Sequence, residues 1–396
     1  MKCKITGTNI KPFMTFGKMP IANGFVGKKN FDKEFFFEME VGFNDELSLF
    51  QLNDHPKPEK MFNENYPFFT GSSEFMKVHF KNYADFVKKE YLKSNSKIIE
   101  IGSNDGTFLK NFNENKNNII GFEPSSNVAE LAKKNDVPTT NEFFNTESVS
   151  KLSNFLGSTD LICASNVICH VPNLNNLIES IDLLLTKSGT FIFEEPYLGS
   201  MFNRVSYDQI YDEHIFIFSA TAIKNIFQRY NFDLIDALPQ KTHGGSMRYI
   251  VKRKKNSTPT ANLSKILDDE KRAKLDSPES CLIFKKNCEI SKEKIKNKIN
   301  LLKKNGKSIC GYAATSKSTT ILNYCGIDAS HIDYICDTTE EKIGKYTPGS
   351  HIPVKNMEYF YKNQTDSIYL FAWNHMNEIL QKEKHFKGEW FSHVSL

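Results

Sequence analysis

The chain has 396 residues, 39% of them hydrophobic and 25% charged, a balance typical of a folded globular protein rather than a disordered one. This length predicts two domains, with room for a small third unit. The 51 basic and 47 acidic residues are interspersed and leave a formal net charge of +4, which argues against a large basic surface for nucleic acid. No apolar run reaches the roughly 18 residues that a membrane-spanning helix needs.

The eight cysteines form no C-x-x-C pair, so the sequence supports neither a disulfide framework nor a zinc ribbon. The N-terminus lacks the basic stretch and apolar run of a secretory signal. We therefore expect a reduced, cytoplasmic protein without a membrane or nucleic-acid partner. The oligomeric state stays open between a monomer and a small homo-oligomer.

The first part of the chain, residues 1–75, combines short mixed segments with turn signals such as "KMPIANG", which predicts a small, loop-rich N-terminal domain. A helical pattern at 72–92 leads out of it. The next part, residues 76–253, alternates apolar strands with helical patterns. The strands are expected at 97–102, 118–124, 160–166 and 189–196, and the helices at 125–135 and 174–189. This alternation predicts a parallel, doubly wound α/β sheet, closed by an antiparallel pair at 232–240 and 246–254.

The last part, residues 254–396, begins in the polar segment "KRKKNSTPTANLSK", which reads as a linker. A charged helix is expected next, with an apolar face made of Phe284, Cys288, Ile295, Ile299 and Leu302. Strand and helix patterns return from residue 307 onward. The sequence therefore predicts a second, C-terminal α/β domain.

The segment "IIEIGSNDGTF" places Glu100, Gly102 and Gly106 in the order E-x-G-x-x-x-G at the end of the first of these strands. Glycines there let the backbone turn tightly against a ligand, and the helix behind them offers free N–H groups. A dinucleotide fingerprint would need glycines where the chain has Asn104 and Thr107, so the pattern argues against NAD.

Polar side chains also follow the next two strands. Glu123 ends the second strand about twenty residues on, where a carboxylate suits the two hydroxyls of a ribose. Asn166 follows the third strand, while Asn104 and Asp105 belong to the glycine loop, which Asp105 is expected to hold. This combination resembles the S-adenosylmethionine site of class I methyltransferases, in which Asn166 would lie near the methionine end of the cofactor. S-adenosylmethionine is therefore the expected cofactor.

A second cluster, "YDEHIFIFS", gathers Tyr211, Asp212, Glu213 and His214 directly before an apolar run. Two interpretations stand side by side: a solvated loop that is rich in titratable groups, or a site where a proton is moved. Imidazole titrates near neutral pH, which favours the second interpretation.

Several long motifs occur in the order found in sugar C-methyltransferases, and the resemblance extends from about Tyr66 to Asp337. The motifs are "EIGSNDGTFL", "GFEPSSNVA", "SNVICHVPNLN", "FEEPYL", "IYDEHIFIFS", "THGGSMRYIV" and "GYAATSKSTTILNYCGI". Members of that family methylate a carbon of nucleotide-linked keto-deoxysugars. The resemblance implies a class I methyltransferase Rossmann-like domain between a small N-terminal lobe and a C-terminal α/β domain that helps to hold the nucleotide sugar.

The resemblance also implies roles in the chemistry. A carbon nucleophile requires removal of a proton next to a carbonyl, so a base and a donor for the enolate oxygen are needed. His214 is the expected base and Tyr211 the donor to the oxyanion. Glu213 is expected to orient His214, to bind a sugar hydroxyl or to take part in the proton transfer. His170, in "CHVPN", and Tyr66, in "YPFFTGSS", are expected beside the sugar. Taken alone, each of these two residues is also compatible with a purely structural role.

Two further segments are expected to hold the substrate. His243 and Gly244, in "THGGSMR", suggest close approach of the backbone to a ligand, although they could equally shape a turn. The segment "GYAATSKSTT" lacks the order of a P-loop but could receive a pyrophosphate at a helix N-terminus. The candidate residues are Tyr312, Ser316 and Lys317 for the phosphates and Asp337 for the ribose or base.

The N-terminal domain departs from the resembled family, which carries two C-x-x-C pairs that bind zinc. Only Cys3 is present; Thr6 stands at its partner position, and Phe43 and Glu46 lie near the expected second pair. We therefore expect no metal and a domain held by packing instead, with the Phe-rich stretch 35–37 contributing.

The resulting hypothesis is a C-methyltransferase that acts through an enolate on a nucleotide-diphosphate keto-deoxysugar, in the biosynthesis of a branched sugar. Methylation of oxygen or nitrogen on such a sugar is one alternative. A catalytically silent relative that binds a nucleotide sugar is another.

Overall fold

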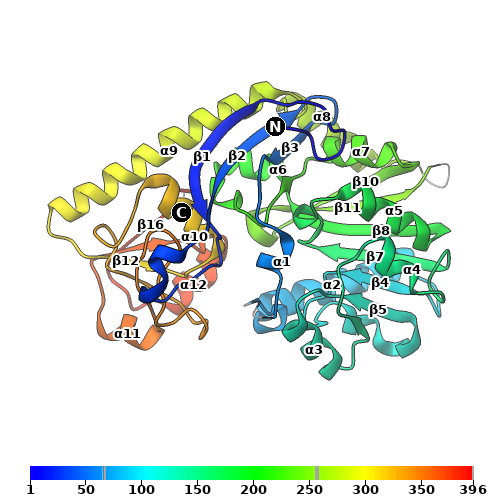
Figure 1. Ribbon diagram of the computed structural model, residues 1–396, viewed down its shortest axis with the longest axis horizontal. Helices are drawn as coiled ribbons and strands as arrows, with labels where there is room; N and C mark the ends of the chain where they lie inside the picture. Colours follow the sequence, from blue (N-terminus) through cyan, green and yellow to red (C-terminus); the bar gives the residue numbers. More distant parts are fainter. Residues whose placement is uncertain (65, 67, 255–257, 395–396) are drawn as a thin grey trace.

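The computed structural model describes residues 1–64, 66, 68–254 and 258–394. Three parts follow one another along the chain (Figure 1). A large α/β domain and a smaller C-terminal α/β domain lie at the two ends of the molecule, and the first strands arch between them. Within the described ranges, no helix is long and apolar enough to cross a membrane.

The large domain is built on one seven-stranded sheet, in the order β10-β11-β8-β7-β4-β5-β6. Its parallel part consists of β4 (Ile98–Ile101), β5 (Ile119–Phe122), β6 (Thr139–Thr140), β7 (Thr159–Ser165) and β8 (Leu185–Pro196). The antiparallel strands β10 (Phe232–Gln240) and β11 (Ser246–Arg253) close one edge, with β11 paired to β8. The predicted parallel sheet and its closing pair are both confirmed. The carboxyl ends of these five parallel strands therefore share one edge of the sheet.

Helices cover both faces of this sheet. They are α2 (Glu74–Tyr91), α3 (Ser126–Lys134), α4 (Thr146–Ser150), α5 (Leu174–Leu184) and α7 (Ala220–Gln228). The short helix α6 (Leu198–Arg204) packs instead against the N-terminal lobe and the helix that follows α8. The α2 helix begins where the Ser73 side chain accepts a hydrogen bond from the Met76 amide. The α5 helix is shorter than predicted, because the chain enters β8 at Leu185 instead of continuing the helix to residue 189.

The N-terminal lobe is a sheet rather than the loop-rich unit that the sequence predicts. It contains β1 (Pro12–Pro20), β2 (Phe36–Asn44) and β3 (Leu49–Leu52), and its fourth strand is β9 (Phe216–Ile217) from the large domain. The expected packing of the Phe-rich stretch is wrong for two of its members: Phe35 and Phe36 are 44% and 42% exposed, whereas Phe37 is buried. Side chains alternate across a strand, so Phe36 and Phe37 of β2 face opposite sides, whereas Phe35 precedes the strand.

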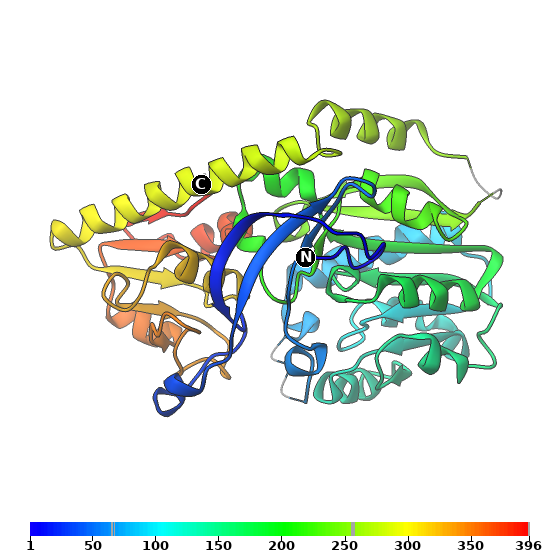
Figure 2. The ribbon, with the colours of Figure 1, turned by 45° about the horizontal axis from the view of Figure 1, so that its top comes forward.

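Two helices connect the large domain to the C-terminal one. The α8 helix (Ala261–Arg272) occupies part of the predicted linker and stays with the large domain, where buried Glu270 accepts hydrogen bonds from the amides of Ala220 and Thr221. The α9 helix (Pro278–Lys304) then runs along the C-terminal domain (Figure 2). The predicted apolar face is confirmed: Phe284, Cys288, Ile295 and Ile299 are buried, and Leu302 packs against the same core.

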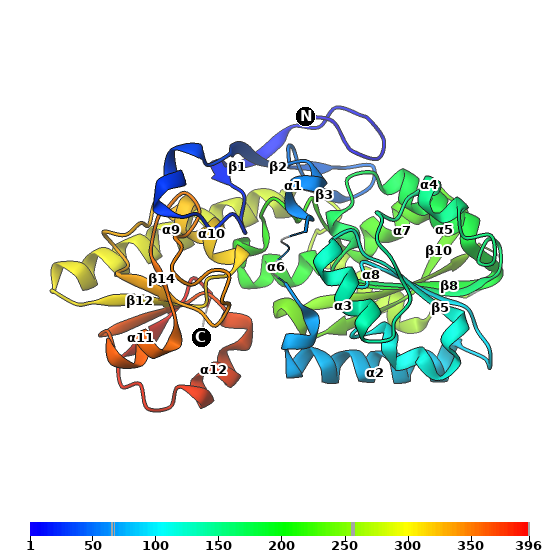
Figure 3. The same cartoon turned by 60° about the horizontal axis from the view of Figure 1, so that its bottom comes forward.

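The C-terminal domain contains a five-stranded parallel sheet, in the order β14-β13-β12-β15-β16. Its strands are β12 (Ile309–Tyr312), β13 (Tyr334–Cys336), β14 (Val354–Lys355), β15 (Ser367–Leu370) and β16 (Glu389–Phe391). The helices of this domain are α10 (Ser316–Cys325), α11 (Met357–Lys362) and α12 (Met376–Lys382) (Figure 3). The predicted second α/β unit is thus confirmed.

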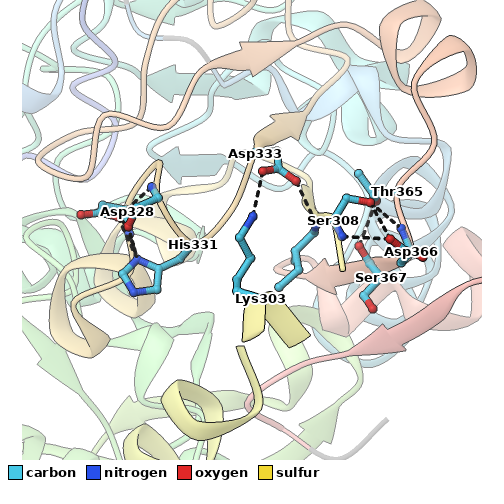
Figure 4. Close-up of polar contacts among 10 residues, drawn as sticks. Lys303, Ser308, Asp328, His331, Asp333, Thr365, Asp366 and Ser367 are labelled. Carbon is cyan, nitrogen blue, oxygen red and sulfur yellow. Dashed lines mark hydrogen bonds and ion pairs between the residues drawn. The ribbon is translucent and has the colours of Figure 1, made fainter. Parts of the chain in front are cut away.

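Two aspartates fasten the amino ends of these strands (Figure 4). Asp333 accepts a hydrogen bond from the Ile309 amide at 3.0 Å and pairs with Lys303, while Asp366 accepts from the amide of Ser308 at 2.9 Å and pairs with Lys307. These contacts hold the start of β12 to the starts of its neighbours. The opposite, carboxyl ends of the strands remain available for a site.

Candidate active site

A cavity of about 900 Å³ lies between the two α/β domains. The large domain lines it with the loops that follow β4, β5, β7 and β8, and the C-terminal domain lines it with the start of α10 and residues 338–342. Because parallel strands gather their loops at one edge, ligands typically bind in this position. Of the predicted site residues, those that line the cavity are Tyr66, Glu100, Gly102, Asn104, Glu123, Asn166, His170, Tyr211, Glu213, His243, Ser316 and Lys317.

The glycine loop after β4 is shaped for close approach. Gly102 has φ +64°, and a Cβ atom at this position would collide with the Val167 side chain. Asp105 holds the loop in place, because its carboxylate accepts hydrogen bonds from the amides of Gly71 at 2.7 Å and Thr107 at 3.2 Å. Neither Asp105 nor Gly106 lines the cavity; Gly106, with φ +78°, packs against Val137.

Glu100 and Glu123 stand at the ends of β4 and β5. The Glu123 carboxylate accepts hydrogen bonds from the Ser125 amide at 2.8 Å and the Asn104 amide at 3.1 Å. Burial raises the pKa of Glu123 and raises that of Glu100 well above its usual range. Asn166, at φ +57°, has a buried Oδ1 that no described residue contacts with a hydrogen bond. Such an unpartnered polar atom marks a place for a polar ligand.

Tyr211 and His214 form a buried hydrogen-bonded pair. His214 Nδ1 lies 2.7 Å from the Gln209 carbonyl oxygen, which can only accept, so this nitrogen carries the proton. His214 Nε2 therefore accepts from the Tyr211 hydroxyl, at 2.8 Å. Burial, with His170 nearby, lowers the pKa of His214 well below its usual value and keeps the ring neutral. Because only Tyr211 lines the cavity, His214 reaches it through the Tyr211 hydroxyl rather than directly.

His170 stacks on His214, with the ring centres 5.2 Å apart, and its other face meets Phe62. Burial lowers the pKa of His170 to about 3, so this ring is also neutral at ordinary pH. Its Nε2 is buried without a hydrogen-bond partner in the described part of the chain. Tyr66 lies on the same wall, with its ring 5.5 Å from that of Phe62, and burial raises the pKa of its hydroxyl.

Asp212 and Glu213 are two adjacent buried carboxyls held by the N-terminal lobe. Asp212 Oδ1 accepts from the Ala22 amide at 3.1 Å, and Glu213 Oε1 accepts from the Asn23 side-chain amide at 2.8 Å. Burial raises the pKa of both carboxyls, and the charge of Glu213 raises that of Asp212 further. The nearby Lys342 ammonium opposes this shift at Glu213.

The "THGG" segment forms a tight turn beside the C-terminal domain. His243 has φ +52°, lines the cavity and is held neutral, because burial lowers its pKa to about 3. Gly244 has φ +81° and packs so closely on Trp373 that a Cβ atom would overlap the ring. Gly244 thus approaches the C-terminal domain rather than the cavity.

The C-terminal domain supplies an unpaired cation. Lys317, in the first turn of α10, has a buried Nζ to which the described residues offer no hydrogen-bond acceptor, and it lies 5.5 Å from the centre of the Trp373 ring. Burial lowers its pKa, while the charge of Asp208 opposes that shift. Ser316 precedes it at the helix N-terminus, where an anion is favoured.

The other two predicted substrate contacts lie outside the cavity lining. The Tyr312 hydroxyl donates to Glu383 at 2.8 Å. Asp337 uses both carboxylate oxygens within its own domain, accepting from the amides of Ala314 at 2.6 Å and Thr339 at 2.7 Å. Asp337 therefore shapes the loop at 338–342, whose residues do line the cavity.

Several residues of the site were not predicted from the sequence. Glu194 lines the cavity and pairs with Arg248 and His79, whose Nε2 is 2.7 Å away. Glu195 accepts hydrogen bonds from the amides of Val167 at 3.0 Å and Ile168 at 2.7 Å, and so holds the segment that carries Asn166 and His170. The segment "FEEP" could have indicated both glutamates, since two acidic residues end an otherwise apolar strand.

The N-terminal lobe does not offer a zinc ligand set among its described residues. Cys3 is buried in the apolar core, Thr6 bonds to Thr8, Phe43 is buried, and Glu46 pairs with Arg229. A structural zinc site needs four ligands, mostly thiolates and imidazoles. The absence of a structural metal from this lobe stays a prediction. The side chains found at the four expected ligand positions are consistent with it.

Family models match the three parts of the chain in order. They are described as "Putative zinc binding domain" over residues 3–62, "Methyltransferase domain" over 75–237 and "C-methyltransferase C-terminal domain" over 241–394. The C-methyltransferase NovU of Streptomyces niveus is 25% identical over 97% of this chain and 92% of its own length. These matches and the sheet define an S-adenosylmethionine-dependent methyltransferase. The match over the C-terminal domain and the full-length relative make it, more narrowly, a C-methyltransferase.

Two solved structures are similar to part of this chain. A methyltransferase from Anabaena variabilis covers 45% of this chain with 86% of its own, at 18% identity and a TM-score of 0.36. A protein from Pyrococcus horikoshii covers 51% of this chain with all of its own, at 14% identity and a TM-score of 0.37.

S-adenosylmethionine fits the part of the cavity at the ends of β4, β5 and β7. Gly102 lines the cavity without a side chain, Glu123 would present its carboxyl to a ribose, and Asn166 has a buried oxygen without a hydrogen-bond partner among the described residues. When bound there, the cofactor supplies an activated methyl group on sulfur. The remaining cavity, toward Tyr211 and Lys317, is left for the second substrate.

Proposed function

We propose that this enzyme methylates a ring carbon next to a ketone in a nucleotide-diphosphate keto-deoxysugar, as a step in making a branched sugar. The observation that carries the proposal is the buried Tyr211–His214 pair. Tyr211 lines the same cavity as the cofactor loop and Lys317, and its hydroxyl donates to His214 at 2.8 Å. A carbon acid needs such an acid–base group close to the methyl donor.

The geometry supports a relay for the proton. The carbon-bound proton passes to the Tyr211 oxygen while the Tyr211 proton passes to Nε2 of neutral His214. The electron pair of the broken C–H bond becomes an enolate, whose carbon would attack the methyl group of bound S-adenosylmethionine as the methyl–sulfur bond breaks and S-adenosylhomocysteine leaves. His170, with its unpartnered Nε2 on the same wall, is placed to hydrogen-bond the ketone oxygen. Well-placed acid–base groups contribute factors of about 10²–10⁴ in rate.

The nucleotide end of the substrate would lie against the C-terminal domain. Lys317 has a buried Nζ without a hydrogen-bond partner in the described chain, and Ser316 stands beside it at the N-terminus of α10. A diphosphate carries the charge that both features favour. A substrate held there extends toward Tyr211 and the cofactor loop.

Two other functions remain as outcomes of the test. Methylation of an oxygen or nitrogen would not require a base for a carbon acid. A silent relative would bind S-adenosylmethionine and a nucleotide sugar without turnover.

Mass spectrometry and NMR of a panel of nucleotide keto-deoxysugars, incubated with enzyme and S-adenosylmethionine, distinguish these outcomes. The proposal expects one added methyl group on a ring carbon next to the ketone. A methyl on oxygen or nitrogen overturns it in favour of the first alternative. Thermal stabilisation by both ligands without any product favours the second.

A further inference from the structure

The segment that carries the candidate catalytic residues is anchored in the N-terminal lobe. Residues 211–214 lead directly into β9, which pairs with β3 of that lobe through Phe50 opposite Ile217. The Leu52 amide donates to the Ile215 carbonyl oxygen at 2.8 Å, one residue after His214. The lobe therefore holds one end of the segment through backbone hydrogen bonds.

A loop of the same lobe reaches the segment from the other side. After β1, the Ala22 amide donates to Asp212, and the Ala22 carbonyl accepts from the Thr319 hydroxyl of α10 at 2.8 Å. The next residue, Asn23, lines the cavity and donates its side-chain amide to Glu213 at 2.8 Å. Asn23 thus contacts a cavity carboxylate that lies 190 residues away in sequence.

We propose that Asn23 is a positioning residue that sets the charge and orientation of the Glu213 carboxylate. An amide N–H stabilises an ionised carboxylate more than a protonated one, because the hydrogen bond is charge-assisted. The N-terminal lobe then contributes to the reaction through this contact rather than through a metal. The inference rests on the proposed role of residues 211–214, and its first test needs no sugar.

Other groups also act on Glu213. Asp212, Tyr66, Tyr211 and Cys169 interact electrostatically with its carboxylate, and Lys342 from the C-terminal domain supplies a positive charge. The burial of Glu213 raises its pKa, while Asn23 and Lys342 lower it. Removal of the Asn23 donor therefore moves the pKa further upward.

The test is an infrared pH titration of the C=O stretch of protonated carboxyls, with Glu213→Gln as the reference that identifies the band. In Asn23→Leu, which keeps the side-chain size but removes the donor, the midpoint rises by about one to two pH units, the value of one hydrogen bond to a charged group. Asn53→Leu is the matched control: Asn53 in the same lobe donates to Glu40 at 3.0 Å, and neither residue lines the cavity.

An unchanged midpoint in Asn23→Leu, or an equal shift in Asn53→Leu, overturns the inference. If Asn23→Leu does not fold, Asn23→Ala, which also removes the donor, replaces it, and the same rise is expected. Once a substrate is identified, the pH dependence of kcat in Asn23→Leu is expected to shift upward in the same way, while the Kd of S-adenosylmethionine stays constant. A product other than a carbon-methylated sugar refutes the proposed function and leaves the infrared result standing.

Discussion

At the residue scale, the Tyr211 hydroxyl connects the cavity to His214. Tyr211→Phe keeps the ring and removes the only oxygen through which His214 contacts the cavity wall. We expect kcat for methyl transfer to fall by about 10²–10⁴, with the Kd of S-adenosylmethionine unchanged by calorimetry. Tyr207→Phe is the control, because the Tyr207 hydroxyl is buried against Ser291 and Cys325, away from the cavity lining. Equal losses in both variants would contradict the assigned role.

Glu195 gives a second residue-scale prediction, on stability. Burial raises its pKa from 4.5 to about 7, so the folded protein keeps this carboxyl protonated where the unfolded chain ionises it. Stability is therefore fully present below pH 4.5 and falls by about 3 kcal/mol as the pH rises through 7. Glu195→Gln retains an oxygen for the amides of Val167 and Ile168 and removes this loss.

The measurement is the free energy of unfolding at pH 4 and pH 8 by urea denaturation. The difference in the free energy of unfolding between Glu195→Gln and the wild type should be more favourable to the variant at pH 8 than at pH 4. For Glu130→Gln, on the exposed face of α3, this difference should be the same at both pH values. A gain that is the same at both pH values would show that the carboxyl is not responsible.

At the element scale, the glycine loop after β4 packs closely against the segment after β7. In Gly102→Ala, the added methyl collides with Val167, next to Asn166. We expect the Kd of S-adenosylmethionine to rise at least about tenfold, since displaced contacts of this kind cost one or more kcal/mol. Calorimetric titration of the cofactor measures it.

Gly157→Ala is the matched control for this change. Gly157 also has a positive φ, +59°, but nothing lies within 4 Å of an added Cβ. Both variants should lose about 1 kcal/mol of stability from backbone strain, and only Gly102→Ala should lose cofactor affinity. Weaker cofactor binding in both would point to general destabilisation instead.

The elements also show what the sequence could predict. Glu100, Glu123 and Asn166 were identifiable because parallel strands bring their carboxyl ends to one edge, whatever the rest of the fold does. The contact from Asn23 to Glu213 was not, because it depends on a sheet whose fourth strand lies far along the chain. The mistaken burial of Phe36 has a local cause: composition suggested a core, but the alternation of side chains along β2 points Phe36 and Phe37 to opposite faces. Phe35 lies before the strand.

At the scale of the whole molecule, the site exists only where the domains meet. The large domain supplies the cofactor loop and Tyr211, the C-terminal domain supplies Lys317 and Lys342, and the N-terminal lobe supplies Asn23. The ion pair between Glu34 and His351 also fastens that lobe to the C-terminal domain. Substitutions in the C-terminal domain should therefore affect substrate binding, and substitutions in the large domain should affect the chemistry.

Lys317→Met tests this separation. We expect the KM for the nucleotide sugar to rise by about 10–100-fold, the usual cost of one lost hydrogen bond to a charged group, with the Kd of S-adenosylmethionine unchanged. Lys307→Met is the control, because Lys307 pairs with Asp366 at the opposite ends of the strands. If Lys317→Met lowered kcat alone, the residue would belong to the chemistry rather than to substrate binding.

The most direct test of the central claim is hydrogen exchange at carbon. The enzyme is incubated in deuterium oxide with a nucleotide keto-deoxysugar and S-adenosylhomocysteine, which carries no methyl group, and deuterium beside the ketone is followed by mass spectrometry and NMR. The account predicts exchange with the wild type, and strongly suppressed exchange with Tyr211→Phe and with His214→Asn, while both variants still bind the cofactor. Exchange at the wild-type rate in His214→Asn would contradict the Tyr211–His214 relay.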